Sequence, residues 1–276
     1  MKAMDPGTGL AILGSAAGGA KIVEKILGPT AEYVGIGLKN WTERRIQNVA
    51  RIFHKAAQKL GSDIDTPGIV PPRVLKEVLN EGSYSDDELT AEYFGGILAS
   101  ARSPNGRDDR AASYLRLTSE LSTYQIRFHF TAYTLFRRVF LGSTLRPTFA
   151  DDLGKMLLLL PYELLFVAMD FTSQEPGHDI LVHCASGLGR HKLIDCVAWG
   201  KVEHLNTTGK KYVGADRWID VTAPGMIVEP THFGIEYYLW ALGVGRASLP
   251  QFLNADLKLP SLPEVRIPDG AAKTSR

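Results

Sequence analysis

Apolar residues recur every three or four positions from residue 28 to about 140, which is the spacing of helices that bury one face. The helices predicted from this pattern cover about residues 29–60, 74–79, 86–101, 108–121 and 123–140. Pro29 suits a first helical turn and Gly61 a helix end. Ser85 and Glu88 have the spacing of a capping box in front of the third helix. This part of the chain is therefore expected to be a helical body.

The pattern changes after residue 170. A helix is predicted from Ile180, capped by Asp179, with Cys184 and Leu188 on its buried face. Three β-like runs and a last helix follow, at 197–202, 212–213, 218–221 and 233–242. A helix, short strands with a basic connection, and a further helix are typical of a winged helix. The predicted fold class is mainly α, a multi-helix body with a C-terminal winged-helix-like α+β part.

Four segments follow from these patterns. They are a small-residue N-terminal helix (1–27), the helical body (28–170), a winged-helix-like domain (171–246) and a Pro-rich tail (247–276). The apolar run at 156–163 is broken by Pro161 and Glu163 and is predicted to be a buried helix.

Two observations concern the N-terminal segment. Gly14 and Gly18 form a Gly-x-x-x-Gly pattern, which allows close packing of a helix against a second copy of itself. Residues 8–26 are too short an apolar stretch to span a bilayer but could lie on a membrane surface. Self-association, a homo-oligomer and contact with a membrane surface are the partner hypotheses that follow.

Charge and cysteine content narrow the function classes. The chain has 31 Lys and Arg against 30 Asp and Glu, a net charge of +1, so nucleic-acid binding would have to be local. Two cysteines in 276 residues favour a reducing compartment over a disulfide framework. The start of the chain has no secretory pattern, and a cytoplasmic location is expected, with membrane association as the alternative.

The segment from His183 to Arg190 reads His-Cys-x-x-Gly-x-Gly-Arg, the phosphate-binding loop of the protein tyrosine phosphatases. In such a loop Cys184 would be the nucleophile and Arg190 would bind phosphoryl oxygens with two parallel hydrogen bonds. Asp170 is the candidate general acid. His191 stands where these enzymes have Ser or Thr, and Asp170 lacks their Trp-Pro-Asp setting. The phosphatase hypothesis is therefore the alternative, not the preferred interpretation.

Four segments carry a resemblance to a bacterial family. They are Leu27–Glu32, Ile69–Leu75, the acidic-to-apolar run Asp86–Ser100, and Leu188–Ile194. Together they resemble the abortive-infection protein alpha family. The resemblance implies a helical protein of phage defence, acting alone or with another defence-system or phage protein. It brings no catalytic residues, and it places Arg190 on a recognition-type helix.

The preferred hypothesis is a non-enzymatic antiphage defence protein that acts as sensor, scaffold or effector, with no cofactor. A nucleic-acid-binding winged-helix protein is the other alternative. The basic residues that would contact phosphates are Arg190, Lys192, Lys210, Lys211 and Arg217. No metal site is expected, because the histidines and cysteines lack the spacing of zinc ligands.

Overall fold

The computed structural model describes residues 25–26, 43–213, 221–260, 262, 265–268 and 273–274. The segment that carries Gly14 and Gly18, most of residues 8–26 and Arg217 lie outside these ranges. Two compact units divide the chain, and they are described separately below. Unit 1 comprises residues 1–120 and 239–246, and unit 2 comprises residues 121–238 and 247–276. Unit 2 begins at Leu121, so residue 170, the expected domain boundary, lies inside it.

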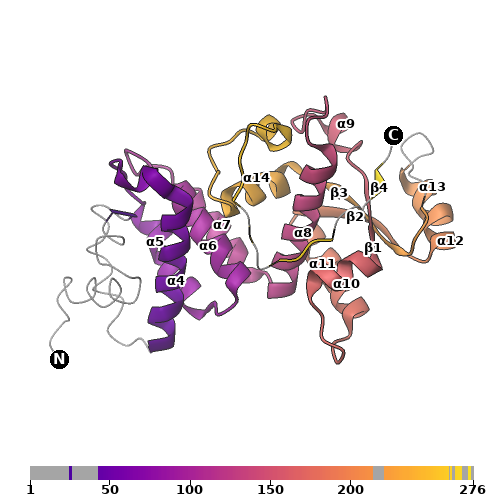
Figure 1. Cartoon of the computed structure of the whole chain (residues 1–276), viewed down its shortest axis with the longest axis horizontal. Coiled ribbons are helices and arrows are strands. Elements are labelled where there is room, and N and C mark those ends of the chain that lie inside the picture. The colour runs from indigo at the N-terminus through magenta and orange to yellow at the C-terminus, as the bar shows by residue number, and fades with distance from the viewer. Residues whose placement is uncertain are drawn as a thin grey trace. The chain divides into compact units, whose positions relative to one another are not determined.

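Unit 1 is helical in the part that the structure describes (Figure 1). Its elements are α4 (Glu43–Leu60), η2 (Gly61–Asp65), α5 (Pro72–Asn80), η3 (Gly82–Tyr84), α6 (Glu88–Ala101) and α7 (Ala111–Glu120). Helix α4 starts inside the predicted range 29–60, whose first part lies outside the described residues. The bounds of α5, α6 and α7 match the other predicted helices of this unit closely.

Helix α6 is the central helix of unit 1, because every residue from Leu89 to Ala101 is buried. Two glycines allow neighbours to approach it closely. A Cβ atom on Gly95 would lie 2.6 Å from the Cβ of Lys55 on α4. A Cβ on Gly96 would lie 1.7 Å from the carbonyl oxygen of Ala241, at the end of α14. Larger residues at either position would push these elements apart.

The cap of α6 differs from the prediction. Asp87, not Ser85, is the N-cap, and its carboxylate accepts a hydrogen bond from the Thr90 amide at 2.7 Å. The predicted capping box of Ser85 and Glu88 is wrong, because the helix starts later than the pattern indicated. The Ser85 hydroxyl is buried and has no hydrogen-bond partner among the described residues.

Unit 2 combines helices with an antiparallel sheet. Its helices are α8 (Thr123–Phe140), α9 (Ala150–Leu153), α10 (Tyr162–Met169), α11 (Gly177–Arg190), α12 (Val202–His204), η4 (Leu205–Gly209), α13 (Lys210–Val213), α14 (His232–Ala241) and η6 (Leu249–Leu253). Its strands are β1 (Leu158–Pro161), β2 (Ile194–Gly200), β3 (Gly225–Pro230) and β4 (Lys273–Thr274). Helix α14 ends in unit 1, to which its last three residues belong.

The strand order is β2-β3-β1-β4, and each neighbouring pair is antiparallel (Figure 1). Leu159 pairs with Ile227, and Cys196 pairs with Val228. The elements run in the order α8, β1, α10, α11, β2, connection, β3, and β3 lies between β1 and β2. This order is that of a winged helix, with α11 in the position of the recognition helix and the β2–β3 connection in that of the wing. The predicted mainly α fold with an α+β part is confirmed.

Three details of the prediction for unit 2 are wrong. Residues 158–161 form strand β1 within the run predicted to be a helix, and residues 212–213 are helical instead of extended. Helix α11 begins at Gly177, before the predicted cap at Asp179. The β-like run at 218–221 lies outside the described residues except for Val221, and strand β3 was not predicted.

Candidate nucleic-acid interface

The eight residues from His183 to Arg190 form the last two turns of helix α11. Their backbone N–H groups belong to a helix, so they do not surround a phosphate-sized hollow. Cys184 is fully buried, and burial raises the pKa of its thiol to about 12. A nucleophilic cysteine needs a lowered pKa. The predicted phosphate-binding loop at Cys184 and Arg190 is therefore wrong.

Asp170, the candidate general acid of the phosphatase hypothesis, lies at the end of a helix. Asp170 follows the last residue of α10 and adopts a left-handed conformation with φ 57°. Short polar residues are tolerated in this conformation at the end of a helix. Asp170 thus ends α10.

Packing explains Gly187 of the motif but not Gly189. Helices α8 and α11 are in contact, and a Cβ on Gly187 would lie 1.8 Å from Nε2 of Gln125 on α8. Gln125 is buried and belongs to the capping box of α8, in which its side chain accepts from the Ser122 amide at 2.9 Å. Gly189 has open space, since its nearest neighbour would be the Ile194 oxygen at 3.7 Å.

We expect Gly187→Ala to lower the free energy of unfolding by about 1–3 kcal/mol, because the new methyl group displaces the buried Gln125 side chain. Gly189→Ala is the matched control on the same helix. It should raise the free energy of unfolding by about 0.5–1 kcal/mol, because alanine favours the helix and meets no neighbour. Urea unfolding measures both, and equal effects of the two substitutions would contradict the packing explanation.

The C-terminus of α11 closes in a Schellman motif. The Leu193 amide donates to the Leu188 oxygen at 2.9 Å, and the Lys192 amide donates to the Gly189 oxygen at 3.0 Å. Lys192 adopts the left-handed conformation that this motif requires, with φ 57°. The turn therefore ends the helix and exposes Lys192 two residues after Arg190.

Helix α8 and Thr231, the residue before α14, hold this turn in place. The Tyr133 hydroxyl on α8 donates to the Leu193 oxygen at 2.6 Å and accepts from the Thr231 amide at 3.1 Å. The Thr231 hydroxyl donates to the Lys192 oxygen at 2.6 Å. These bonds fix where α11 ends relative to the helices that carry it.

The outer face of α11 is polar. Its exposed side chains include Asp179, His183, Ser186 and Arg190, which follow one another at helical spacing. Its buried face includes Leu181, Cys184, Ala185 and Leu188. The predictions that Cys184 points inward and Arg190 outward are confirmed.

The connection between β2 and β3 is partly helical. Lys201, Lys210 and Lys211 on it are exposed. Leu205 is fully buried and packs with Leu159 and Ile227 of the sheet, and Asn206 donates to the Val221 oxygen at 3.2 Å. The described part of the connection thus packs on the sheet at Leu205, and Lys210 and Lys211 lie on the short helix α13 instead of an extended hairpin, while Lys201 precedes α12.

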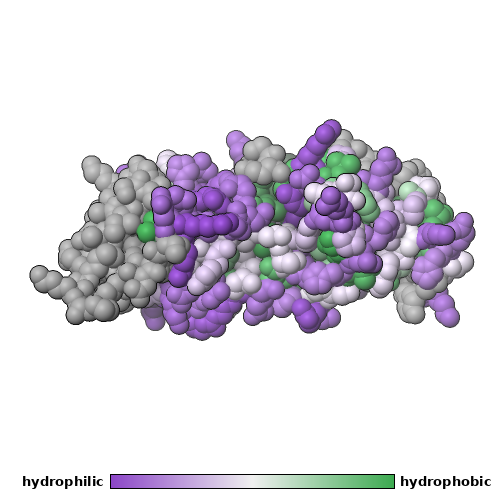
Figure 2. All heavy atoms as spheres, turned by 90° about the horizontal axis from the view of Figure 1, so that it is seen from below, coloured by the Kyte–Doolittle hydropathy of each residue, from purple (hydrophilic) through white to green (hydrophobic). Residues whose placement is uncertain are grey.

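One surface feature escaped the sequence analysis. On β2, just before the connection, the Trp199 side chain is 43% exposed. The space-filling view shows mostly hydrophilic surface, with small hydrophobic areas (Figure 2). Lys201 follows two residues later, and an exposed tryptophan ring is a flat surface on which a base can stack.

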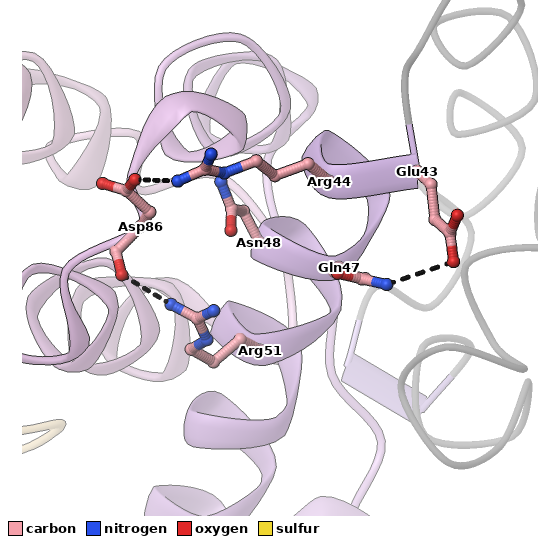
Figure 3. Close-up of a pocket in the computed structure, with 6 residues that line it drawn as sticks. All are labelled: Glu43, Arg44, Gln47, Asn48, Arg51 and Asp86. Atoms are coloured by element: carbon pink, nitrogen blue, oxygen red, sulfur yellow. Dashed lines mark hydrogen bonds and ion pairs between the residues drawn. The ribbon is translucent and has the colours of Figure 1, made fainter.

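Unit 1 has a polar hollow of about 530 Å³ that sequence patterns did not indicate (Figure 3). Arg44 on α4 forms an ion pair with the Asp86 carboxylate, and Arg51 donates to the Asp86 backbone oxygen at 3.1 Å. Asn48 between them donates to the Ser83 oxygen at 3.0 Å. Because these cations already face an acidic residue of the same hollow, the contacts join α4 to the segment before α6 and do not form an anion site.

Two further findings concern metals and membranes. Within the described ranges, no three His, Cys, Asp or Glu side chains are grouped so that they could hold a metal ion. None of the helices described has the length and apolar character needed to cross a membrane.

The chain matches no model of a protein family, no curated protein and no solved structure.

Proposed function

We propose that this chain is a non-enzymatic antiphage defence protein whose unit 2 binds double-stranded DNA. The observation that carries the binding proposal is the order α8, β1, α10, α11, β2, connection, β3, with α11 in the position of a recognition helix. The resemblance of four sequence segments to the abortive-infection protein alpha family supports the role in defence.

Helix α11 has the dimensions and side chains for a DNA groove. Its 14 residues span about 21 Å, and the major groove of B-DNA admits one α-helix. His183, Ser186 and Arg190 on its exposed face can hydrogen-bond base edges or phosphates. Arg190 suits guanine in particular, because its two parallel donors match the two acceptors of that base.

The basic residues around α11 supply phosphate contacts. Lys192 lies at its end, and Lys201, Lys210 and Lys211 lie on the connection. Such contacts release counterions from DNA, and binding should therefore weaken steeply as salt rises. Asp179 near the start of α11 opposes this charge, which leaves the C-terminal half of the helix as the favoured contact region.

The double substitution Lys210→Glu and Lys211→Glu should weaken binding to a DNA duplex of about three helical turns by at least ~10-fold, because it reverses two charges at the phosphates. The salt dependence, as the slope of log K against log salt, should become shallower by about 2. Fluorescence anisotropy over a range of salt concentrations measures both quantities.

Lys155→Glu with Lys258→Glu is the matched control, since both lysines are exposed residues of unit 2 outside α11 and the connection. Equal weakening by the control pair, or no DNA binding by the unaltered protein at low salt, would overturn the binding proposal. Phage challenge of bacteria expressing each variant tests the role in defence. The proposal expects protection to fall with the first pair only.

A further inference from the structure

Unit 2 contains a pocket that has no part in the DNA-binding proposal. Its volume is about 370 Å³, within the range of small-molecule sites. Its lining comes from one face of α8, from Tyr238 on α14 and from the C-terminal segment, and comprises Phe130, Thr134, Arg137, Arg138, Leu141, Tyr238, Leu259, Pro260, Leu262, Val265 and Ile267. The α8 residues recur at helical spacing, so they form one continuous wall.

Most of this wall is apolar. Seven of the lining side chains carry no polar atoms, namely Phe130, Leu141, Leu259, Pro260, Leu262, Val265 and Ile267. Leu141 is 44% exposed at the end of α8, although Phe130, Leu262 and Val265 of the same pocket are buried. A ligand with an apolar chain or ring would cover this leucine and remove apolar surface from water.

The polar groups of the pocket are few and adjacent. The hydroxyls of Thr134 and Tyr238 hydrogen-bond each other at 3.0 Å. Tyr238 is almost fully buried, so its hydroxyl has a fixed direction. Burial raises the pKa of Tyr238, and although the hydrogen bond with Thr134 and the positive charges of both arginines offset part of this rise, the pKa is about 12.

Arg137 is a positive charge without an acidic partner in the described ranges. Its guanidinium donates to the carbonyl oxygens of Phe252, Asn254 and Leu257, and it forms no ion pair with a described residue. Carbonyl oxygens hold the group rigidly but do not neutralise its charge. A partly buried cation is stabilised by an anion, because the low-polarity surroundings strengthen their attraction.

We propose that this pocket binds a small apolar monocarboxylate, such as a medium-chain fatty acid. The apolar chain lies against Leu141 and the C-terminal segment, and the carboxylate lies near Arg137 and accepts a hydrogen bond from the Thr134–Tyr238 hydroxyl pair. One negative charge matches the site, because most Arg137 donors are already used by carbonyl oxygens. The site does not depend on the DNA-binding proposal.

Isothermal titration calorimetry of the full chain with decanoate tests the proposal. We expect one saturable site, and binding of 1-decanol, which has the same chain without the charge, at least ~10-fold weaker. Thr134→Val removes a hydroxyl at nearly constant volume and should weaken decanoate binding by about 10-fold. It should leave the weaker binding of decanol unchanged.

Thr131→Val is the matched control, because Thr131 lies on the same helix, is fully buried and does not line the pocket. It should bind decanoate as the unaltered protein does. Three outcomes overturn the proposal: no saturable decanoate binding below about 1 mM, equal affinity for decanol, or equal loss of binding in Thr134→Val and Thr131→Val. Tighter binding of decyl phosphate than of decanoate would overturn the assignment to a monocarboxylate.

Discussion

Glu92→Ala should lower the free energy of unfolding by about 3–5 kcal/mol, because it leaves the buried ammonium group of Lys59 without a counterion among the described residues and leaves Lys55 with Glu88. The Glu92 carboxylate on α6 forms ion pairs with Lys55 and Lys59 on α4. The side chains of Glu92 and Lys59 are each 5% exposed, and that of Lys55 is 12% exposed. Urea unfolding followed by circular dichroism measures the loss.

The same groups show why the charges depend on one another. Burial by itself lowers the pKa of Lys55, but hydrogen bonds and the negative charges of Glu88 and Glu92 outweigh it and raise this pKa above its usual value. Close packing at Gly95 brings the two helices together at this point. Removal of Glu92 therefore leaves the buried charge of Lys59 uncompensated and reduces the compensation of Lys55 to Glu88, instead of simply deleting one contact.

Glu88→Ala is the control for the Glu92 experiment. Glu88 also pairs with Lys55, but its side chain is 43% exposed, so its loss should cost about 1 kcal/mol or less. The triple variant Glu92→Leu, Lys55→Met and Lys59→Met should recover most of the lost stability, because it removes all the buried charges together. A Glu92→Ala variant no less stable than Glu88→Ala would contradict this explanation.

Stability of unit 2 should fall as the pH falls from about 6.5 towards 3, and His129 should account for up to about 4–5 kcal/mol of that fall. His129 on α8 is fully buried, and burial lowers its pKa from the ordinary 6.5 to about 3. The centroid of its ring lies 4.5 Å from the ring centroid of Tyr133 and 5.0 Å from that of Tyr237. Its Nε2 donates to the Gly234 oxygen at 3.3 Å.

The direction follows from proton binding in the two states. Between pH 6.5 and 3 the unfolded chain binds a proton at this histidine and the folded chain does not. Lower pH therefore favours unfolding, with a slope of up to about 1.4 kcal/mol per pH unit. The neutral ring contributes its full stability above pH 6.5, and this contribution is lost as pH falls through the window.

Unfolding by urea at pH 7, 5.5 and 4 tests this dependence in the unaltered protein and in His129→Gln. The glutamine variant can still donate to the Gly234 oxygen but cannot become protonated, so its pH slope should be smaller. His183→Gln is the control, because His183 is exposed on α11 and its replacement should leave the slope unchanged. Equal slopes in His129→Gln and the unaltered protein would refute the role of His129.

Local periodicity was a sound guide where one face of a helix is buried. Helix α8 was predicted over 123–140 and spans Thr123–Phe140, because its apolar and aromatic residues recur at helical spacing. The same argument placed Cys184 inward and Arg190 outward on α11, and the structure agrees.

Periodicity failed where burial comes from several sides. Leu158, Leu159 and Leu160 are all fully buried, and a continuous apolar run has the same pattern in a buried helix and in a buried strand. These residues form a strand because they pair with β3, about 70 residues further along the chain. The helical connection after β2 likewise depends on Leu205, which packs against the sheet.

The sequence alone determined the mainly helical class, the helices α8 and α14 and the inward face of α11, because these depend on spacing between neighbours along the chain. The pairing of β1, β2 and β3 into a winged-helix-like order was not determined by it. Only the tertiary structure decided between the helix predicted for His183–Arg190 and the alternative of a phosphate-binding loop. The residue pattern of this segment is compatible with both structures, and contacts with residues far away in the sequence stabilise the helix. Gly187 accommodates Gln125 of α8, and Leu193 is held by Tyr133, so the segment is stabilised as a packed helix.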